Sequence, residues 1–275
     1  MKMANGETMM IEQCADLLFE SEVKRRPIPP LTESHPELAL ESAYRIQQLN
    51  IDRRTRAGET IIGHKIGLTG KPMQEKFGVS EPDFGHLLNT MLLDADAPLD
   101  LGPLIDPQIE VEPAFVLGRE LRGPGLTVED VIDATEYIVA CYEIIDSRIV
   151  DWRIKLQDTV ADNGSSARFI LGREKIKPGN LVLDNLATEL KLDGEIVDSG
   201  NTRAILGHPA MGIAWLGNKV SEFGVALEEG HVVLPGTCIR SFRLSGHQQA
   251  QGRIEGLGGE SIDIIGTPYV SSQGQ

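Results

Sequence analysis

The sequence has few cysteines and no long apolar run. Of its 275 residues only three are cysteines, Cys14, Cys141 and Cys238, and none belongs to a Cys-x-x-Cys pair. This spacing argues against both a disulfide framework and a zinc site built from thiolates. No stretch of about 18 apolar residues is present, and residues 1–10 lack a secretory stretch, so we expect no membrane span and a cytoplasmic location.

Basic residues are also scarce, with 26 against 41 acidic residues and a net charge of -15. Such a surface repels a phosphate backbone, which argues against nucleic acid as a partner. An acidic chain that binds an acidic small molecule needs a local reversal of charge, and a divalent cation provides one.

The pattern of apolar residues changes near residue 60. Residues 11–57 have helical spacing interrupted by prolines, which predicts two main helices. The remainder alternates short β-branched runs with Gly, Pro, Asp and Asn, which favours a rolled, mostly-β body over a doubly wound parallel sheet. We therefore predict an α+β fold with a mainly helical segment over residues 1–75 and a mixed β-barrel domain over 76–275. The expected strands are Ile61–Ile66, Ile109–Leu117, Ile138–Ile145, Ala167–Leu171, Thr188–Leu192, Gly230–Leu234 and Ser261–Ile265, and the expected helices Thr127–Thr135 and Ala210–Val220.

Two glutamates lie on one face of a predicted strand. In the segment Gln108–Glu112, alternation places Ile109 and Val111 on one face and Glu110 and Glu112 on the other. A solvated strand tolerates such a pair, so this motif alone leaves open an exposed Glu-x-Glu without a ligand.

A third glutamate lies within a run that reads as a buried strand. Glu143 interrupts the apolar segment Ile138–Ile145, where a carboxylate must be protonated, paired or bound to a metal. Arg148 and Arg153 are alternative partners that would make it structural. Three carboxylates without neighbouring Cys or His form a hard oxygen site, which suits Mg²⁺ or Mn²⁺ rather than zinc.

Six segments, in this order, carry a resemblance to a known family. They are Lys65-Ile-Gly-Leu-Thr69, Glu81-Pro-Asp-Phe-Gly85, Ile109-Glu-Val-Glu112, Tyr142-Glu-Ile-Ile-Asp-Ser-Arg148, Asp158-Thr-Val-Ala-Asp-Asn-Gly-Ser-Ser166 and Gly207-His-Pro209. The chain resembles the 2-oxopent-4-enoate hydratases and 4-oxalocrotonate decarboxylases of the fumarylacetoacetate hydrolase superfamily. The resemblance implies a rolled mixed β-barrel with an N-terminal helical portion, and a Mg²⁺ or Mn²⁺ ion held by Glu110, Glu112 and Glu143. Pro113 departs from the family pattern and puts local ladder hydrogen bonding in doubt.

The resemblance also implies that Lys65 and Asp83 line the pocket as catalytic groups. Lys65 sits in an apolar strand, where burial and the metal are expected to lower its pKa, so that it binds the substrate carboxylate or relays a proton. The alternative is a surface lysine whose stem covers apolar residues. Asp83 is expected in a turn between Pro82 and Phe84, where it is either an acid or base or a simple turn residue.

Two further residues are weaker candidates from the same resemblance. His35 is a candidate catalytic residue, although a lone loop histidine is more often an ordinary surface residue. Ser166 is a candidate substrate contact in a loop of small residues, with Asp162 and Asn163 as its support, although Ser and Asn are also general loop formers. The other histidines receive no role.

The function that the resemblance implies is hydration of a 2-hydroxypenta-2,4-dienoate-type acid to a 4-hydroxy-2-oxo acid, in meta-cleavage degradation of aromatic compounds. One alternative is decarboxylation of an oxalocrotonate-like diacid by the same pocket. Another is a non-catalytic partner subunit that stabilises a related enzyme. The resemblance further implies a homo-oligomer and allows association with enzymes of neighbouring steps.

Overall fold

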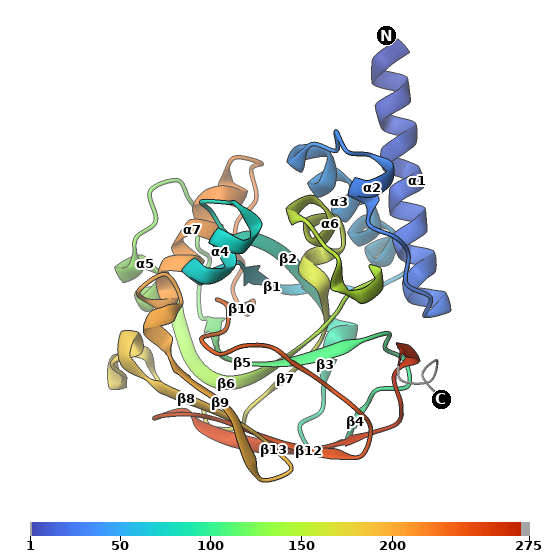
Figure 1. The fold of residues 1–275 in the computed structure, drawn as a ribbon. Helices are drawn as coiled ribbons and strands as arrows, with labels where there is room; N and C mark the ends of the chain where they lie inside the picture. The colour runs from blue at the N-terminus through green and yellow to red at the C-terminus, as the bar shows by residue number, and fades with distance from the viewer. Residues whose placement is uncertain (1, 271–275) are drawn as a thin grey trace.

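Three helices begin the chain. The structure is a computed structural model that describes residues 2–270, and it opens with α1 (Lys2–Lys24), α2 (Leu31–Ser34) and α3 (Leu40–Arg56). Buried residues at helical spacing join α1 to α3, among them Cys14 and Leu18 on α1 and Ala43 and Ile46 on α3. Figure 1 shows the N-terminal end of α1 extending beyond the rest of the molecule. None of the helices within residues 2–270 has the length and apolar character that crossing a membrane requires.

The larger of two sheets has the order β2–β1–β10–β5–β6–β7–β3, with β11 also paired to β5. It mixes parallel and antiparallel pairs: β1 runs parallel to β10, whereas β5 and β6 are antiparallel over their full lengths. Its strands are β1 (Ile61–Gly67), β2 (Asp83–Leu88), β3 (Leu92–Leu93), β5 (Pro107–Leu117), β6 (Thr135–Asp146), β7 (Ser166–Leu171), β10 (Val232–Leu234) and β11 (Phe242–Arg243).

The smaller sheet has the order β4–β13–β12–β8–β9 and packs against the larger one (Figure 1). Its strands are β4 (Leu99–Asp100), β8 (Ala187–Leu192), β9 (Glu195–Asn201), β12 (Gln248–Ile254) and β13 (Gly258–Ile265). Their inward residues, such as Leu190, Ala250 and Ile262, share one buried cluster with Val111 and Tyr142 of the larger sheet. Burial of apolar side chains from both sheets holds the rolled body together.

The remaining helices cover the body in two groups. Helix α6 (Leu156–Ala161) contacts α3, while α5 (Val128–Ala134) contacts α7 (Pro209–Ser221) on the other side (Figure 1). The predicted capping box of α5 is present, with Thr127 and Asp130 each bonding the other's backbone N–H. The shorter helices are α4 (Lys71–Phe77) and the 3₁₀ turns η1 (Asn89–Met91), η2 (Val150–Trp152), η3 (Asn163–Ser165), η4 (Pro178–Asn180), η5 (Leu183–Asn185) and η6 (Thr202–Ala204).

The predicted α+β class with rolled mixed sheets is confirmed, and every predicted strand overlaps one in the structure. The strand β1, from the segment predicted as N-terminal, lies inside the larger sheet between β2 and β10. The division between residues 75 and 76 stays a prediction.

Pro113 does not interrupt β5. The strand pairs with β6 on both sides of this residue and at it, with Pro113 opposite Ala140. On its other edge β5 pairs with β11 at Ile109 and with β10 from Phe115, so Pro113 falls in the gap between these two partners. A residue without an N–H is tolerated where the ladder is already interrupted.

Candidate metal and active site

Strands β5 and β6 bring three glutamates to one face of the larger sheet. Glu110 lies directly opposite Glu143 in the antiparallel register, and Glu112 is two residues further along the same face. One carboxylate oxygen from each of the three lies within 4.8 Å of the others. Glu112 and Glu143 are fully buried and Glu110 is half-buried.

The carboxylate of Glu143 lacks the partners that a buried charge requires. Neither Oε1 nor Oε2 has a hydrogen-bond partner among the described residues, and the nearest cation is Lys65, with Nζ 3.5 Å from Oε1. Glu112 does have a hydrogen-bond partner, because the Gly236 N–H donates to its Oε2 at 2.8 Å. Burial of a carboxylate without compensation is costly. An oxygen-only donor set with two buried carboxylate oxygens that accept no hydrogen bond therefore fits a hard divalent cation.

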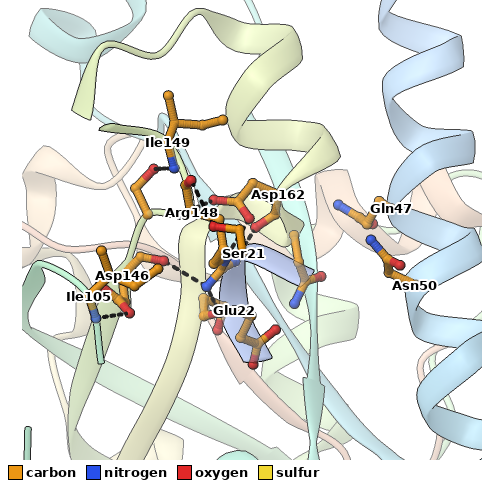
Figure 2. A network of polar contacts seen from close by, with 12 residues as sticks. Ser21, Glu22, Gln47, Asn50, Ile105, Asp146, Arg148, Ile149 and Asp162 are labelled. Atoms are coloured by element: carbon orange, nitrogen blue, oxygen red, sulfur yellow. Dashed lines mark hydrogen bonds and ion pairs between the residues drawn. The ribbon is translucent and has the colours of Figure 1, made fainter. Parts of the chain in front are cut away.

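The arginines proposed as alternative partners of Glu143 bind elsewhere. Arg148 is buried against Asp162, and Arg153 donates to Glu33 at 2.7 Å. Figure 2 shows Arg148 and Asp162 in contact near α1. The interpretation of Glu143 as half of an arginine ion pair is therefore wrong.

Crowding of negative charge raises the pKa values of the glutamates. Burial, followed by repulsion from Glu143, raises the pKa of Glu110 to about 7. The same two causes raise the pKa of Glu112 well above its ordinary value. Burial also raises the pKa of Glu143, although Lys65 and the Ser166 hydroxyl offset part of this effect. The three carboxylates by themselves therefore attract protons or another cation near neutral pH.

Lys65 is the cation of this cluster. It projects from β1, is 6% exposed, and donates from Nζ to the Gly164 carbonyl at 3.0 Å. The alternative of a surface lysine is therefore wrong. The expected lowering of its pKa is also wrong when only the protein's own groups act on it. Burial disfavours the ammonium, but the negative charges of four carboxylates outweigh burial and raise the pKa; they belong to Glu143, Asp83, Glu110 and Glu112. Lys65 is a charged group at neutral pH.

Asp83 faces the same region from β2. It is the first residue of that strand, opposite Gly67 of β1, so its expected position in a turn is wrong. Its side chain is buried, and its Oδ1 has no hydrogen-bond partner among residues 2–270. Burial raises its pKa, and Lys65 offsets part of the rise. A carboxyl of this kind can carry a proton into a buried site.

Ser166 and His35 differ in their positions. Ser166 begins β7 and lies close enough to lower the pKa of Glu143. His35 ends α2 and is half-buried; its hydrogen bonds are backbone ones to Leu31 and Leu38. None of the polar contacts found within residues 2–270 joins the His35 side chain to the glutamates, Lys65 or Asp83.

Two backbone groups also belong to the site, and sequence analysis missed both. They are the Gly164 carbonyl, which accepts from Lys65, and the Gly236 N–H, which donates to Glu112. The cluster of small residues after Asp162 was the available signal for the first. Nothing in the pattern around Gly236 pointed to the second.

Comparison with known proteins identifies the family of this chain. The family described as fumarylacetoacetate (FAA) hydrolase C-terminal matches residues 79–257, a span that includes Asp83, the three glutamates and Ser166. The chain belongs to this family. Lys65 and the N-terminal helices lie before the matched span.

Relatives and solved structures extend the likeness to nearly the whole chain. A 2-hydroxyhexa-2,4-dienoate hydratase from Comamonas testosteroni is 40% identical over 94% of this chain and 99% of its own. A 2-hydroxypent-2,4-dienoate hydratase from Pseudomonas putida is 40% identical over 79% of this chain and 98% of its own. The structure of 4-oxalocrotonate decarboxylase from Pseudomonas putida G7, complexed with magnesium and adipate, is 31% identical, has a TM-score of 0.89, and is matched over 94% and 98% of the two chains. The predicted membership of the hydratase and decarboxylase branch is confirmed.

Proposed function

We propose that this protein is a divalent-metal-dependent hydro-lyase that hydrates a 2-hydroxypenta-2,4-dienoate-type acid to a 4-hydroxy-2-oxo acid. The observation that carries the proposal is the buried glutamate cluster with one ammonium, Lys65, beside it. The 40% identity to hydratases of such acids favours hydration over other reactions of the family.

Glu110, Glu112 and Glu143 would hold the ion, and either Mg²⁺ or Mn²⁺ suits their oxygen atoms. When bound, the ion supplies Lewis acidity toward the 2-oxo acid end of the substrate. Lys65 adds a fixed positive charge for the substrate carboxylate, because its neighbours keep it protonated. A charge placed in advance costs little reorganisation during the reaction.

Asp83 is the proton carrier in this proposal. Burial raises its pKa, and in this proposal its protonated form donates a proton to C5 of the dienol while the 2-hydroxyl proton passes to solvent. The product of that step is a conjugated 2-oxo-3-enoate. The Asp83 carboxylate then takes a proton from the water that attacks C4, and a solvent proton added at C3 of the resulting enolate completes the hydration.

The test is turnover by the purified chain supplied with Mg²⁺ or Mn²⁺. We expect loss of dienol absorbance with formation of a 4-hydroxy-2-oxo acid, and we expect Asp83→Asn to slow it while the fold is retained. Absence of turnover with either metal would contradict the proposal and favour the non-catalytic partner subunit.

Decarboxylation is the second candidate, because the decarboxylase structure superimposes at a TM-score of 0.89. Both reactions need an acidic metal site and a charge that stabilises an enolate. Incubation with 4-oxalocrotonate separates them: the hydratase proposal expects no CO₂ release, and CO₂ as the main product would replace it with decarboxylation.

The biological setting is part of the proposal. The relatives named above act on dienoates, which supports a cytoplasmic role in meta-cleavage catabolism of aromatic compounds. We also propose a homo-oligomer, which size-exclusion chromatography with light scattering tests directly.

A further inference from the structure

The loop that joins α6 to β7 has an unusual backbone. Three consecutive residues have positive φ angles: Asn163 at 56°, Gly164 at 62° and Ser165 at 56°. Such angles suit glycine and are tolerated by Asn, but they are unfavourable for serine. A run of this kind persists only where surrounding contacts hold it, and it often marks a functional position.

The result of this conformation is the placement of one carbonyl. Gly164 O accepts a hydrogen bond from Lys65 Nζ at 3.0 Å. A Cβ on Gly164 would lie 3.0 Å from Cδ of Lys65, so a larger residue would push against the lysine stem. The loop and the lysine side chain are therefore packed directly on each other.

Asn163 attaches this loop to the larger sheet. Its Oδ1 accepts from the His86 N–H at 2.8 Å, and its Nδ2 donates to the His86 carbonyl at 2.9 Å. Strand β2 is the terminal strand of the sheet, so the amide replaces the backbone of a missing neighbouring strand at that residue. Close approach is required here, because a Cβ on Gly85 would lie only 2.3 Å from the Asn163 carbonyl oxygen.

The preceding residue is held from the opposite side. The Arg148 N–H donates to Asp162 Oδ2 at 2.9 Å, and the Arg148 guanidinium contacts both the carboxylate and the carbonyl of Asp162. Figure 2 shows this pair beside Ser21 and Glu22 of α1. The start of the loop is thus anchored toward the N-terminal helices, while Asn163 anchors the next residue to β2.

We propose that Asn163 is a positioning residue for Lys65: by clamping the backbone of His86 it holds the Gly164 carbonyl where the lysine ammonium donates to it. The inference rests on the proposed function in assigning Lys65 a role in turnover. The physical reason is that Lys65 has two acceptors within reach, Gly164 O at 3.0 Å and Glu143 Oε1 at 3.5 Å. Without the first, the ammonium moves toward the carboxylate and away from the position that serves the substrate.

The experiment compares two asparagines that make the same clamp. Asn218 of α7 also binds one backbone residue twice: its Oδ1 accepts from the Leu126 N–H at 2.8 Å, and its Nδ2 donates to the Leu126 carbonyl at 3.1 Å. Asn163→Asp and Asn218→Asp each remove the donated bond and keep the shape. Asn163→Gly removes the clamp without adding charge and tolerates the positive φ.

We expect Asn163→Asp and Asn163→Gly to lower kcat about 10- to 100-fold, as displacement of an oriented group does, with KM changed less than about threefold. We expect Asn218→Asp to lower the melting temperature about as much as Asn163→Asp does and to leave kcat unchanged. A folded Asn163→Gly enzyme with wild-type kcat would overturn the proposal, as would an equal loss of kcat in Asn218→Asp.

A second readout does not depend on turnover. In a crystal structure of Asn163→Gly, we expect Lys65 Nζ to lie beyond hydrogen-bond distance of Gly164 O. If the bond persists at its present length, the positioning role is refuted whatever the enzyme catalyses. If wild-type protein hydrates no dienoate, the proposed function fails, and this structural comparison still decides whether Asn163 positions the lysine.

Discussion

The affinity of the glutamate cluster for a divalent ion should fall steeply as the pH is lowered below 7. The pKa of Glu110 is raised to about 7 by burial and by the charge of Glu143, and the same causes raise the pKa of Glu112 well above its ordinary value. A metal binds the ionised carboxylates, so below these pKa values it must displace protons.

The magnitude follows from the pKa of Glu110. At pH 6 about one molecule in ten has this carboxylate ionised, so the Kd rises about tenfold over its high-pH limit, which is about 1.4 kcal/mol. Proton release from Glu112 steepens the dependence toward about a hundredfold per pH unit when both groups titrate.

Isothermal titration with Mn²⁺ at pH values from 5.5 to 8.5, in buffers of different ionisation enthalpy, measures both the Kd and the protons released. The expected result is release of one to two protons per ion at pH 6 and fewer at pH 8.5. A Kd that stays constant between pH 5.5 and 8 would refute the electrostatic account of the site.

Three other predictions concern single side chains. Lys65→Met should lower kcat about 10²- to 10⁴-fold, because it removes the ammonium that lies 3.5 Å from Glu143. Mn²⁺ affinity should be kept or raised, and a retained kcat would exclude a catalytic role. Arg148→Met should lower the free energy of unfolding in urea by about 3–5 kcal/mol, because Asp162 stays buried without its partner; a loss below about 1 kcal/mol would contradict the pairing. The third concerns His86, whose pKa is lowered to about 4 mainly by burial. Between pH 6.5 and 4 the unfolded chain binds more protons at this histidine than the folded chain does. The free energy of unfolding therefore falls by about 3 kcal/mol from this group as the pH is lowered across that window. In urea unfolding, the free energy of unfolding of His86→Leu should fall by about 3 kcal/mol less than that of the wild type over the same pH range. An unchanged pH profile would contradict this assignment to His86.

Sequence pattern predicted the parts of the fold and site that depend on local periodicity. Alternation placed Glu110 and Glu112 on one face, and the apolar run around Glu143 indicated its burial; both features are present in β5 and β6. Strands with polar composition escaped prediction, such as β9 (Glu195–Asn201) and β12 (Gln248–Ile254), because their exposed faces carry few apolar residues.

Other features depend on contacts between distant segments and could not be read locally. Asp83 was expected in a turn because of Pro82, yet pairing with β1 makes it the start of a strand. The pKa of Lys65 was expected to fall because of burial and a neighbouring metal ion, whereas four carboxylates from three strands raise it. The clamp from Asn163 to His86 joins residues 77 positions apart, so no local sequence pattern predicts it.

The most direct test of the central claim is Mn²⁺ titration of Glu143→Gln beside wild-type protein, with circular dichroism to verify the fold. Glutamine keeps the shape of the side chain and removes the charge that the three-carboxylate site requires. We predict one bound ion per chain in the wild type and an affinity at least about a hundredfold weaker in the variant. Equal affinity in a folded variant would show that the ion, if bound, is held elsewhere.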